Sequence, residues 1–277
     1  MGIPHLKDMI RKLSAICVAL VGAFVSPVHA NPAADLVEAS ILTGWRGTDG
    51  RHVAAVHLEL QDGWKTYWRA PGDAGIPPRF NWSGSRNLSD VAITWPTPRT
   101  LSQNGVRTIG YANSLTLPIH FTPKQAGQAI NLDGTLELGL CKDVCLPLTL
   151  RISQDLPQAG GKRDPRIVAA LAARPYSARE AGVGRVACSV SPIEDGMRLR
   201  AEIDVKRQGR DEMAVIETDN PQIWVAQART TRQNGRLLAE TELYHVNGDS
   251  FALNREGLRI TVLGGGKAVD IQGCSAR

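Results

Sequence analysis

The feature that most constrains the fold is an alternation of apolar and polar residues with a period of two. It runs through residues 56–60, 115–121, 198–205 and 258–262. Successive side chains of a β-strand point to opposite faces, so this pattern is typical of strands with one buried face. We therefore predict an all-β protein. Because proline has no N–H to donate to a neighbouring strand, Pro118 predicts that its strand lies at a sheet edge.

One segment favours a helix instead. Asp164 is suited to the N-cap and Pro165 to the first helical position, and the Ala-rich residues 167–174 follow them. Glycine pairs flank this short helix on both sides, which indicates a linker. The predicted organisation is a signal peptide at 1–30, a β domain at 31–156, a linker with a short helix at 157–184, and a second β domain at 185–277.

The first thirty residues have the pattern of a secretory signal. Basic residues come first, the apolar stretch Leu13–Val25 follows, and Val28-His29-Ala30 forms a small-x-small cleavage site. An uncleaved membrane anchor is the alternative, but a span needs roughly 20 apolar residues. No later apolar run is long enough to cross a membrane, so we expect a soluble, exported protein in the periplasm.

Charge argues against one class of partner. The net charge is +5, but the Lys and Arg residues are scattered along the chain. They form no basic cluster with interleaved aromatic residues, so we predict no nucleic-acid partner.

The cysteines carry the most information about function. Cys17 would leave with the signal peptide, and Cys141, Cys145, Cys188 and Cys274 would remain. An even number of cysteines in an exported chain predicts disulfides. Their distribution suggests one pair that is close in sequence and one that is distant.

The close pair fits a β-hairpin. If Lys142-Asp143-Val144 is a three-residue loop, Cys141 lies opposite Cys145. One face of the hairpin then carries only leucine and must be buried. The leucine pairs are Leu140 with Leu146, Leu138 with Leu148, and Leu136 with Leu150, and the other face carries the cysteines, then Gly139 with Pro147, then Glu137 with Thr149.

This geometry predicts a disulfide that other proteins can open. Cross-strand Cβ atoms lie about 4.5–5.5 Å apart, and a disulfide needs about 3.5–4.5 Å. The Cys141–Cys145 bond therefore requires local closing, and strained or exposed disulfides are the more easily reduced ones. Gly139 would leave space for a partner's cysteine to approach, as exchange through a mixed disulfide requires.

Loop length separates the two pairs. In the loop-entropy model, a disulfide stabilises the folded state more when it closes a longer loop. The five-residue ring of Cys141–Cys145 gives about 2 kcal/mol of stabilisation, and the ring of nearly ninety residues closed by Cys188–Cys274 gives about 4.5 kcal/mol. We interpret the first pair as catalytic and the second as a structural disulfide.

Other interpretations remain open at this point. The Cys141–Cys145 disulfide could simply stabilise the hairpin, in which case the chain would be a non-catalytic β-sandwich that serves as a binding or scaffold protein. Cys188 and Cys274 could be free thiols. Two thiolates could also bind copper or zinc, but no His or Cys companion lies nearby in the sequence, and we predict no metal and no other cofactor. A C-x-x-C thioredoxin motif is absent.

Two motifs resemble a known family. Residues 63–78, from Gly63-Trp64-Lys65 through Gly72-Asp73 to Pro77-Pro78, resemble the N-terminal block of the periplasmic domain of the thiol:disulfide interchange protein DsbD family. Residues 141–147, Cys-Lys-Asp-Val-Cys-Leu-Pro, resemble its cysteine segment in the suppressor-of-copper-sensitivity B-type variant. Trp95-Pro96 and Gly110-Tyr111 fit between them. The resemblance covers residues 35–155, and residues 185–277 resemble the second β domain of that variant more weakly.

The resemblance implies two immunoglobulin-like β-sandwiches and a protein-disulfide reductase component, with links to cytochrome c biogenesis and copper tolerance. Cys141 and Cys145 would accept electrons from a membrane-embedded thiol carrier and pass them to periplasmic thioredoxin-like proteins, with Cys145 facing the partner. In the family an aromatic-bearing loop shields the cysteines. The candidates for this cap are Trp64, Tyr67 and Trp68, for which packing in the sandwich core is the alternative.

The sequence departs from the family in two respects. Family members are often fused to a membrane domain and a C-terminal thioredoxin domain, which this sequence does not contain, so we expect a separate membrane protein to reduce it. The family often has an aromatic residue before the first cysteine and an acidic residue after the proline. Gly139-Leu140 and Leu148 stand there instead, which puts the thiol pKa and the choice of partner in doubt.

Overall fold

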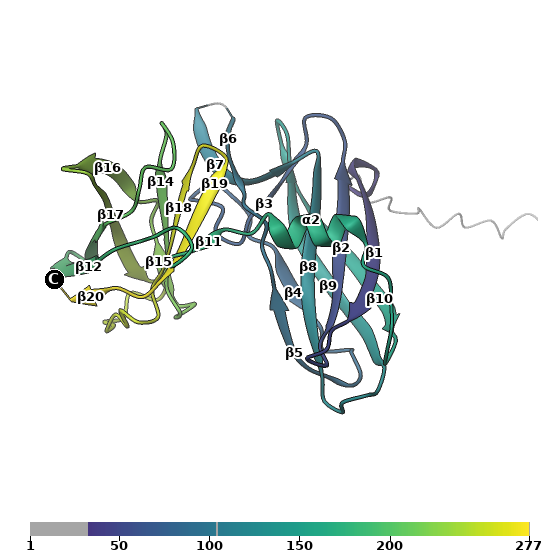
Figure 1. Cartoon of the computed structure of the whole chain (residues 1–277). Coiled ribbons are helices and arrows are strands. Elements are labelled where there is room, and N and C mark those ends of the chain that lie inside the picture. Colours follow the sequence, from purple (N-terminus) through teal and green to yellow (C-terminus); the bar gives the residue numbers. More distant parts are fainter. Residues whose placement is uncertain (1–32, 104, 277) are drawn as a thin grey trace, which may run out of the picture. The chain divides into compact units, whose positions relative to one another are not determined.

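The computed structural model describes residues 33–103 and 105–276, and almost all of its regular structure is β-strand (Figure 1). This confirms the predicted all-β class. The signal peptide expected at residues 1–30 lies outside the described residues. Within the described part of the chain, no helix is long and apolar enough to cross a membrane.

Residues 37–156 form a first β-sandwich. One sheet has the order β1-β2-β8-β5, and the other has the order β10-β9-β3-β7-β6, with β4 added on β9. Side chains from both sheets, such as Leu58 and Leu138, meet in one apolar core. A 3-10 turn, η1 (Ala34–Leu36), precedes the strands β1 (Val37–Arg46), β2 (His52–Leu60), β3 (Lys65–Tyr67), β4 (Arg79–Asn81), β5 (Leu88–Ile93), β6 (Arg99–Gln103), β7 (Val106–Ala112), β8 (Ser114–Pro123), β9 (Ile130–Cys141) and β10 (Cys145–Leu156).

Residues 176–276 form a second β-sandwich. Its sheets have the orders β11-β19-β18-β14 and β15-β17-β13-β12-β20, with β16 added on β17. Leu199 and Ile203 of one sheet pack with Ile260 and Val262 of the other, as the alternation predicted. The strands are β11 (Tyr176–Ser177), β12 (Val186–Ile193), β13 (Gly196–Ile203), β14 (Met213–Glu217), β15 (Ile223–Val225), β16 (Arg229–Gln233), β17 (Arg236–His245), β18 (Arg259–Gly264), β19 (Lys267–Gln272) and β20 (Ser275–Ala276).

The predicted helix is present as α2 (Pro165–Ala172), and the side chain of Asp164 caps it by accepting a hydrogen bond from the N–H of Arg166. The helix packs on the first sandwich, where the fully buried Ile167 contacts an apolar cluster with Val53 and Ala55 of β2 (Figure 1). The strand β2 is therefore buried on both faces along most of its length. The alternation of apolar and polar residues in this strand predicts only one of these two buried faces.

The segment predicted as a linker is attached at both of its ends. The N–H of Arg46 in β1 donates to the carbonyl of Gly160, and β11 pairs in parallel with β19 of the second sandwich. From residue 33 onward, both sandwiches belong to one structural unit. The domain boundaries at 156/157 and 184/185 stay predictions.

The predicted edge position of Pro118 is wrong, because β8 lies between β2 and β5. The carbonyl of Pro118 accepts a hydrogen bond from the N–H of Thr94, just past the last pair of the β5 ladder, Ile93 with Ile119. In an antiparallel strand the N–H and C=O of one residue point to the same side. The missing N–H of Pro118 therefore faces the point where β5 has ended, so the proline costs no ladder hydrogen bond there.

We predict that Ile167→Ala lowers the free energy of unfolding by about 3 kcal/mol, because it opens a cavity under α2. Urea denaturation followed by circular dichroism measures this loss. The matched control is Val168→Ala in the same helix, since Val168 is exposed and its truncation should change stability by less than about 0.5 kcal/mol. Equal losses for the two variants would mean that α2 is not anchored through its buried face.

Candidate functional site

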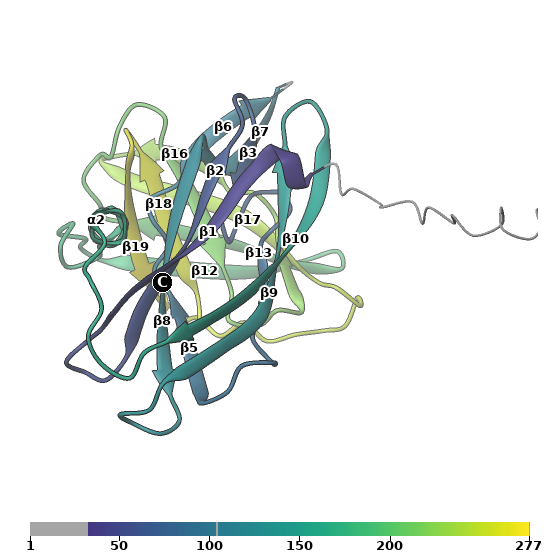
Figure 2. The same cartoon turned by 90° about the vertical axis from the view of Figure 1, so that its right-hand side faces the viewer.

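The β9–β10 hairpin has the predicted register. It places Cys141 opposite Cys145, Leu140 opposite Leu146 and Leu138 opposite Leu148, and it continues to Ile130 opposite Leu156. Figure 2 shows β9 and β10 side by side as one long hairpin. The leucines at 136, 138, 140 and 148 are buried in the core of the first sandwich. Side chains of paired residues leave the same face of a sheet, so the two cysteines lie on the face that points away from this core.

The two cysteines form a disulfide and differ in exposure. Their Cα atoms are 4.1 Å apart. Cys141 is fully buried and Cys145 is exposed. A thiolate from another protein can therefore approach Cys145 more readily than Cys141. Because Cys141 faces away from the leucine core, its burial must come from groups that cover the outer face of the sheet.

Tyr67 of β3 is the first of these covering groups. Its hydroxyl donates a hydrogen bond to Sγ of Cys141 at 2.8 Å and lies 3.6 Å from Sγ of Cys145. Burial raises the pKa of the Tyr67 phenol, so the phenol keeps its proton at neutral pH. It can then donate to a Cys141 thiolate when the disulfide opens, and a hydrogen bond to the charged form favours that form.

Lys65 is a second polar group on this face. It pairs with Cys141 in the sheet, so both side chains leave the same side. The side chain is nearly buried, and this burial lowers the pKa of its ammonium group. A cation beside Cys141 favours the thiolate form of the reduced cysteine.

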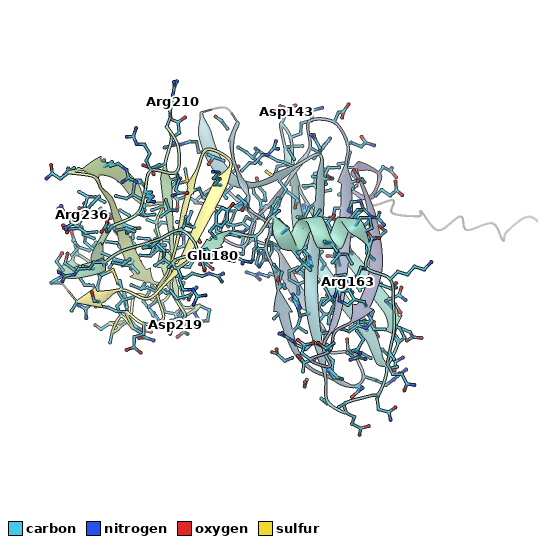
Figure 3. The ribbon with its side chains drawn as sticks, viewed as in Figure 1. Asp143, Arg163, Glu180, Arg210, Asp219 and Arg236 are labelled. Carbon is cyan, nitrogen blue, oxygen red and sulfur yellow. A yellow bond between two sulfur atoms is a disulfide. The ribbon has the colours of Figure 1, made fainter. Side chains whose placement is uncertain are left out.

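The hairpin tip is fixed to the neighbouring turn. The ammonium of Lys142 donates to the carbonyl of Asp62, and its methylene groups lie where a Cβ on Gly63 would be. Gly63 has a positive φ of 80°, which suits glycine at this turn. Asp143 is exposed at the tip of the hairpin (Figure 3). Lys142 and Asp143 are both exposed, but the ammonium of Lys142 is tied to the neighbouring turn by its hydrogen bond to Asp62.

The loop between β3 and β4, residues 68–78, completes the cover. A Cβ on Gly75 would meet the ring of Tyr67 at 3.1 Å, and a Cβ on Gly139 would meet Cβ of Ile76 at 2.8 Å. The loop therefore crosses the outer face of the sheet directly beside the disulfide. The space that we expected Gly139 to leave for a partner's cysteine is filled by Ile76, so the loop must move before a partner can use that space.

The other two predicted cap residues lie elsewhere. Trp68 is fully buried in the core of the first sandwich, and Trp64 packs against the same core. Both flank β3 on the face opposite Tyr67, because alternate residues of a strand point to opposite sides. Of the three aromatic candidates, the structure brings only Tyr67 to the sulfur atoms.

The distant cysteine pair also forms a disulfide. Cys188 of β12 bonds to Cys274 beyond β19, with a Cα separation of 5.8 Å and a sequence separation of 86 residues. Cys188 is fully buried, and both cysteines pack with the apolar core of the second sandwich. Within the described residues, no group of three or more His, Cys, Asp or Glu side chains is arranged to hold a metal ion.

Residues 36–157 match the family model described as "Thiol:disulfide interchange protein DsbD, N-terminal". This segment is therefore similar to a DsbD-type N-terminal domain. It contains the whole cysteine hairpin, Tyr67 and the loop over Gly139. The DsbD-type domain is a module for thiol–disulfide exchange, and its partners are proteins that exchange thiols and disulfides with it.

The fold extends beyond the matched domain. The chain is similar to the crystal structure of the N-terminal periplasmic domain of ScsB from Proteus mirabilis, with a TM-score of 0.63 and 21% identity. The similarity covers 87% of this chain and 93% of that one. It confirms the immunoglobulin-like fold across both sandwiches. A search of curated proteins finds no match.

Sequence reasoning missed two parts of the site beside the DsbD-type cysteine pair. Ile76 carries no polar or aromatic signal, and only its place in the motif at residues 63–78 could have pointed to it. Lys65 lies in the same motif, and its alternation with Trp64 and Thr66 is the signal that places it on the face of Tyr67. The positions of Ile76 and Lys65 beside the cysteines become evident only when the structure places β3 and the loop after it against β9.

We predict that Tyr67→Phe raises the pKa of the Cys141 thiol by about 1–2 units, because it removes a hydrogen bond to a thiolate worth about 1.5–3 kcal/mol. The measurement is thiolate absorbance against pH in a Cys145→Ala background, where Cys141 is the only unpaired cysteine of the described chain. The control is Tyr111→Phe, since the Tyr111 hydroxyl donates to the carbonyl of Pro96 instead. An unchanged Cys141 pKa in Tyr67→Phe would contradict the assigned hydrogen bond.

We predict that the Cys188→Ala/Cys274→Ala double variant loses more stability than the Cys141→Ala/Cys145→Ala double variant. The expected losses are about 4.5 and about 2 kcal/mol, following the lengths of the closed loops. Denaturant unfolding monitored by circular dichroism compares them. A larger loss from the Cys141–Cys145 pair would assign the structural role to the hairpin disulfide.

Proposed function

We propose that this protein passes electrons from a membrane-embedded thiol carrier to thioredoxin-like proteins in the periplasm. The observation that carries the proposal is the asymmetry of the disulfide, with Cys145 exposed and Cys141 buried against the Tyr67 hydroxyl. An exchange protein needs one sulfur within reach of its partner and one that resolves the mixed disulfide. The signal-peptide pattern at residues 1–30 supports the periplasmic location.

Reduction begins at the exposed sulfur. A thiolate of the donor attacks Sγ of Cys145, the Cys141–Cys145 bond breaks, and Cys141 leaves as a thiolate that accepts the hydrogen bond from Tyr67. The second thiol of the donor loses its proton and attacks the donor's own sulfur in the mixed disulfide. Cys145 is released as a thiolate and takes up that proton. The donor has lost two electrons and forms a disulfide, and the hairpin has gained those electrons.

The second half of the cycle runs in reverse on another partner. Cys145 gives up its proton and attacks the disulfide of a thioredoxin-like protein as a thiolate, and the partner's leaving sulfur takes up that proton as the mixed disulfide forms. The Cys141 thiolate then attacks Cys145, restores the hairpin disulfide and releases the partner's second sulfur as a thiolate. The partner has gained the two electrons that the hairpin has lost. The hydrogen bond from Tyr67 favours Cys141 as the leaving thiolate in reduction, and the cation of Lys65 acts in the same direction.

We predict that Cys141→Ala traps thioredoxin-like partners as stable mixed disulfides, because the exposed Cys145 remains and cannot be resolved. In contrast, Cys145→Ala leaves only the buried Cys141 and should trap at least about ten-fold less, as expected for a sulfur without access. Each variant is incubated with an oxidised periplasmic thioredoxin-like protein, and the product is counted by non-reducing electrophoresis and mass spectrometry.

The control is a Cys141→Ala/Cys145→Ala variant, which should trap nothing. Equal trapping by the two single variants would contradict the proposal that partners attack Cys145 first. Failure of both to trap, together with resistance of the native disulfide to mild reductant, would favour an inert structural disulfide instead. Binding of Cu(I) by the reduced protein but not by the double variant would favour copper handling through the same thiolates.

A further inference from the structure

The second sandwich contacts the loop that covers the disulfide. Arg69, which follows β3 in that loop, donates two hydrogen bonds to the carboxylate of Glu217 in β14, both at 3.0 Å. Its guanidinium also donates to the hydroxyl of Thr261 in β18 at 3.2 Å. The fork of arginine thus binds both carboxylate oxygens at once, the geometry that fixes orientation as well as distance.

This ion pair is shielded from water. The side chains of Arg69 and Glu217 are 13% and 22% exposed, and the guanidinium carbon lies 3.9 Å from the ring centre of Trp68. Burial lowers the pKa of Arg69, with the Glu217 carboxylate opposing this effect. A pair at this degree of burial is screened less than one on the surface. It can therefore hold the start of the loop in one place.

A second contact holds the loop four residues later. The carboxylate of Asp73 accepts a hydrogen bond from the backbone N–H of Gln227, between β15 and β16, at 3.1 Å. Gly75 and Ile76 follow directly and lie against Tyr67 and Gly139. The residues that contact Tyr67 and Gly139 therefore lie two and three positions after the second of the two points at which the second sandwich binds the loop.

A cavity adjoins the loop between these two points. A largely apolar cavity of about 290 Å³ lies beside it, lined by Pro71 and Gly72 of the loop and by residues of the second sandwich that include Ile216 and Trp224. The start of the loop also has apolar contacts, since Ala70 packs against a cluster that includes Met213 and Leu263 of the second sandwich. The polar contacts of Arg69 and Asp73 add a directional hold on each side of this packing. The cavity leaves room for the loop to move once those contacts break.

We infer that the second sandwich is a clamp that holds residues 69–76 against the outer face of the hairpin, beside the Cys141–Cys145 disulfide, with Glu217 as the positioning residue. The loop opens when the Arg69–Glu217 pair separates, and opening uncovers the outer face of the hairpin beside Gly139. The inference deepens the proposed function, since it assigns control of access to the same disulfide, but its test needs no physiological partner.

We predict that Glu217→Gln in the full chain speeds reduction of the Cys141–Cys145 disulfide by dithiothreitol by about five-fold or more, since it removes the charge that holds Arg69. In this reaction one dithiothreitol loses two electrons and cyclises, and the hairpin becomes a dithiol. Alkylation of the freed cysteines, read peptide by peptide with mass spectrometry, separates this disulfide from Cys188–Cys274. Hydrogen exchange of the amides at residues 70–76 should increase in the same variant.

The matched control is Glu212→Gln. Glu212 accepts two hydrogen bonds from Arg232, also in a shielded pair, and its partners Gln208 and Arg232 both belong to the second sandwich. The Glu212→Gln substitution should leave the rate of disulfide reduction and the hydrogen exchange of residues 70–76 unchanged, even if it lowers the unfolding midpoint as much as Glu217→Gln does. The charge-reversed pair Arg69→Glu/Glu217→Arg should return the rate toward that of the native chain.

Two results would overturn the clamp. One is a native reduction rate in Glu217→Gln, and the other is equal acceleration in Glu212→Gln, which would show general loosening of the second sandwich. The outcomes for the clamp and for the proposed function are separable. Faster reduction by dithiothreitol with no trapping of thioredoxin-like proteins would retain the clamp and reject the electron-transfer role.

Discussion

The pairing register of the β9–β10 hairpin is the constraint on which the site depends. Leucines on one face of the hairpin are buried in the core of the first sandwich, and this fixes which residues face outward. A slip of one residue would send the cysteines into the core and the leucines to the surface. The apolar core therefore determines the chemistry of the opposite face, where Cys141 meets the Tyr67 hydroxyl and Cys145 reaches solvent.

The hairpin could be predicted from sequence because all of its information is local. The loop length, the leucine pattern and the two cysteines lie within a few residues of one another, and they agree on one register. The helix at Pro165 was predictable for the same reason, since its cap and first position are adjacent. Where a strand was buried on both faces, as in β2, or where a neighbouring strand ended early, as beside Pro118, local pattern gave an incomplete or incorrect result.

The cover over the disulfide could not be predicted in this way. Ile76 reaches Gly139 across more than sixty residues of sequence, and the hydrogen bond between Arg69 and Glu217 joins residues 148 positions apart. No periodic pattern in the sequence indicates either contact, and an isoleucine after a glycine has no distinctive chemistry. The motif at residues 63–78 indicated that this region matters, but only the tertiary structure shows that its aliphatic residue, and not Trp64 or Trp68, lies beside the hairpin.

The order of strands along the chain has a consequence for folding after export. Every strand of the first sandwich precedes residue 157, so its redox pair can form in the oxidising periplasm before the second sandwich is complete. Both sheets of the second sandwich instead need the end of the chain, because β11 pairs with β19 and β12 pairs with β20. A partly folded chain would therefore carry a finished disulfide hairpin ahead of an unfinished half, and loss of its last few residues would remove Cys274 and β20, the parallel neighbour of β12, together.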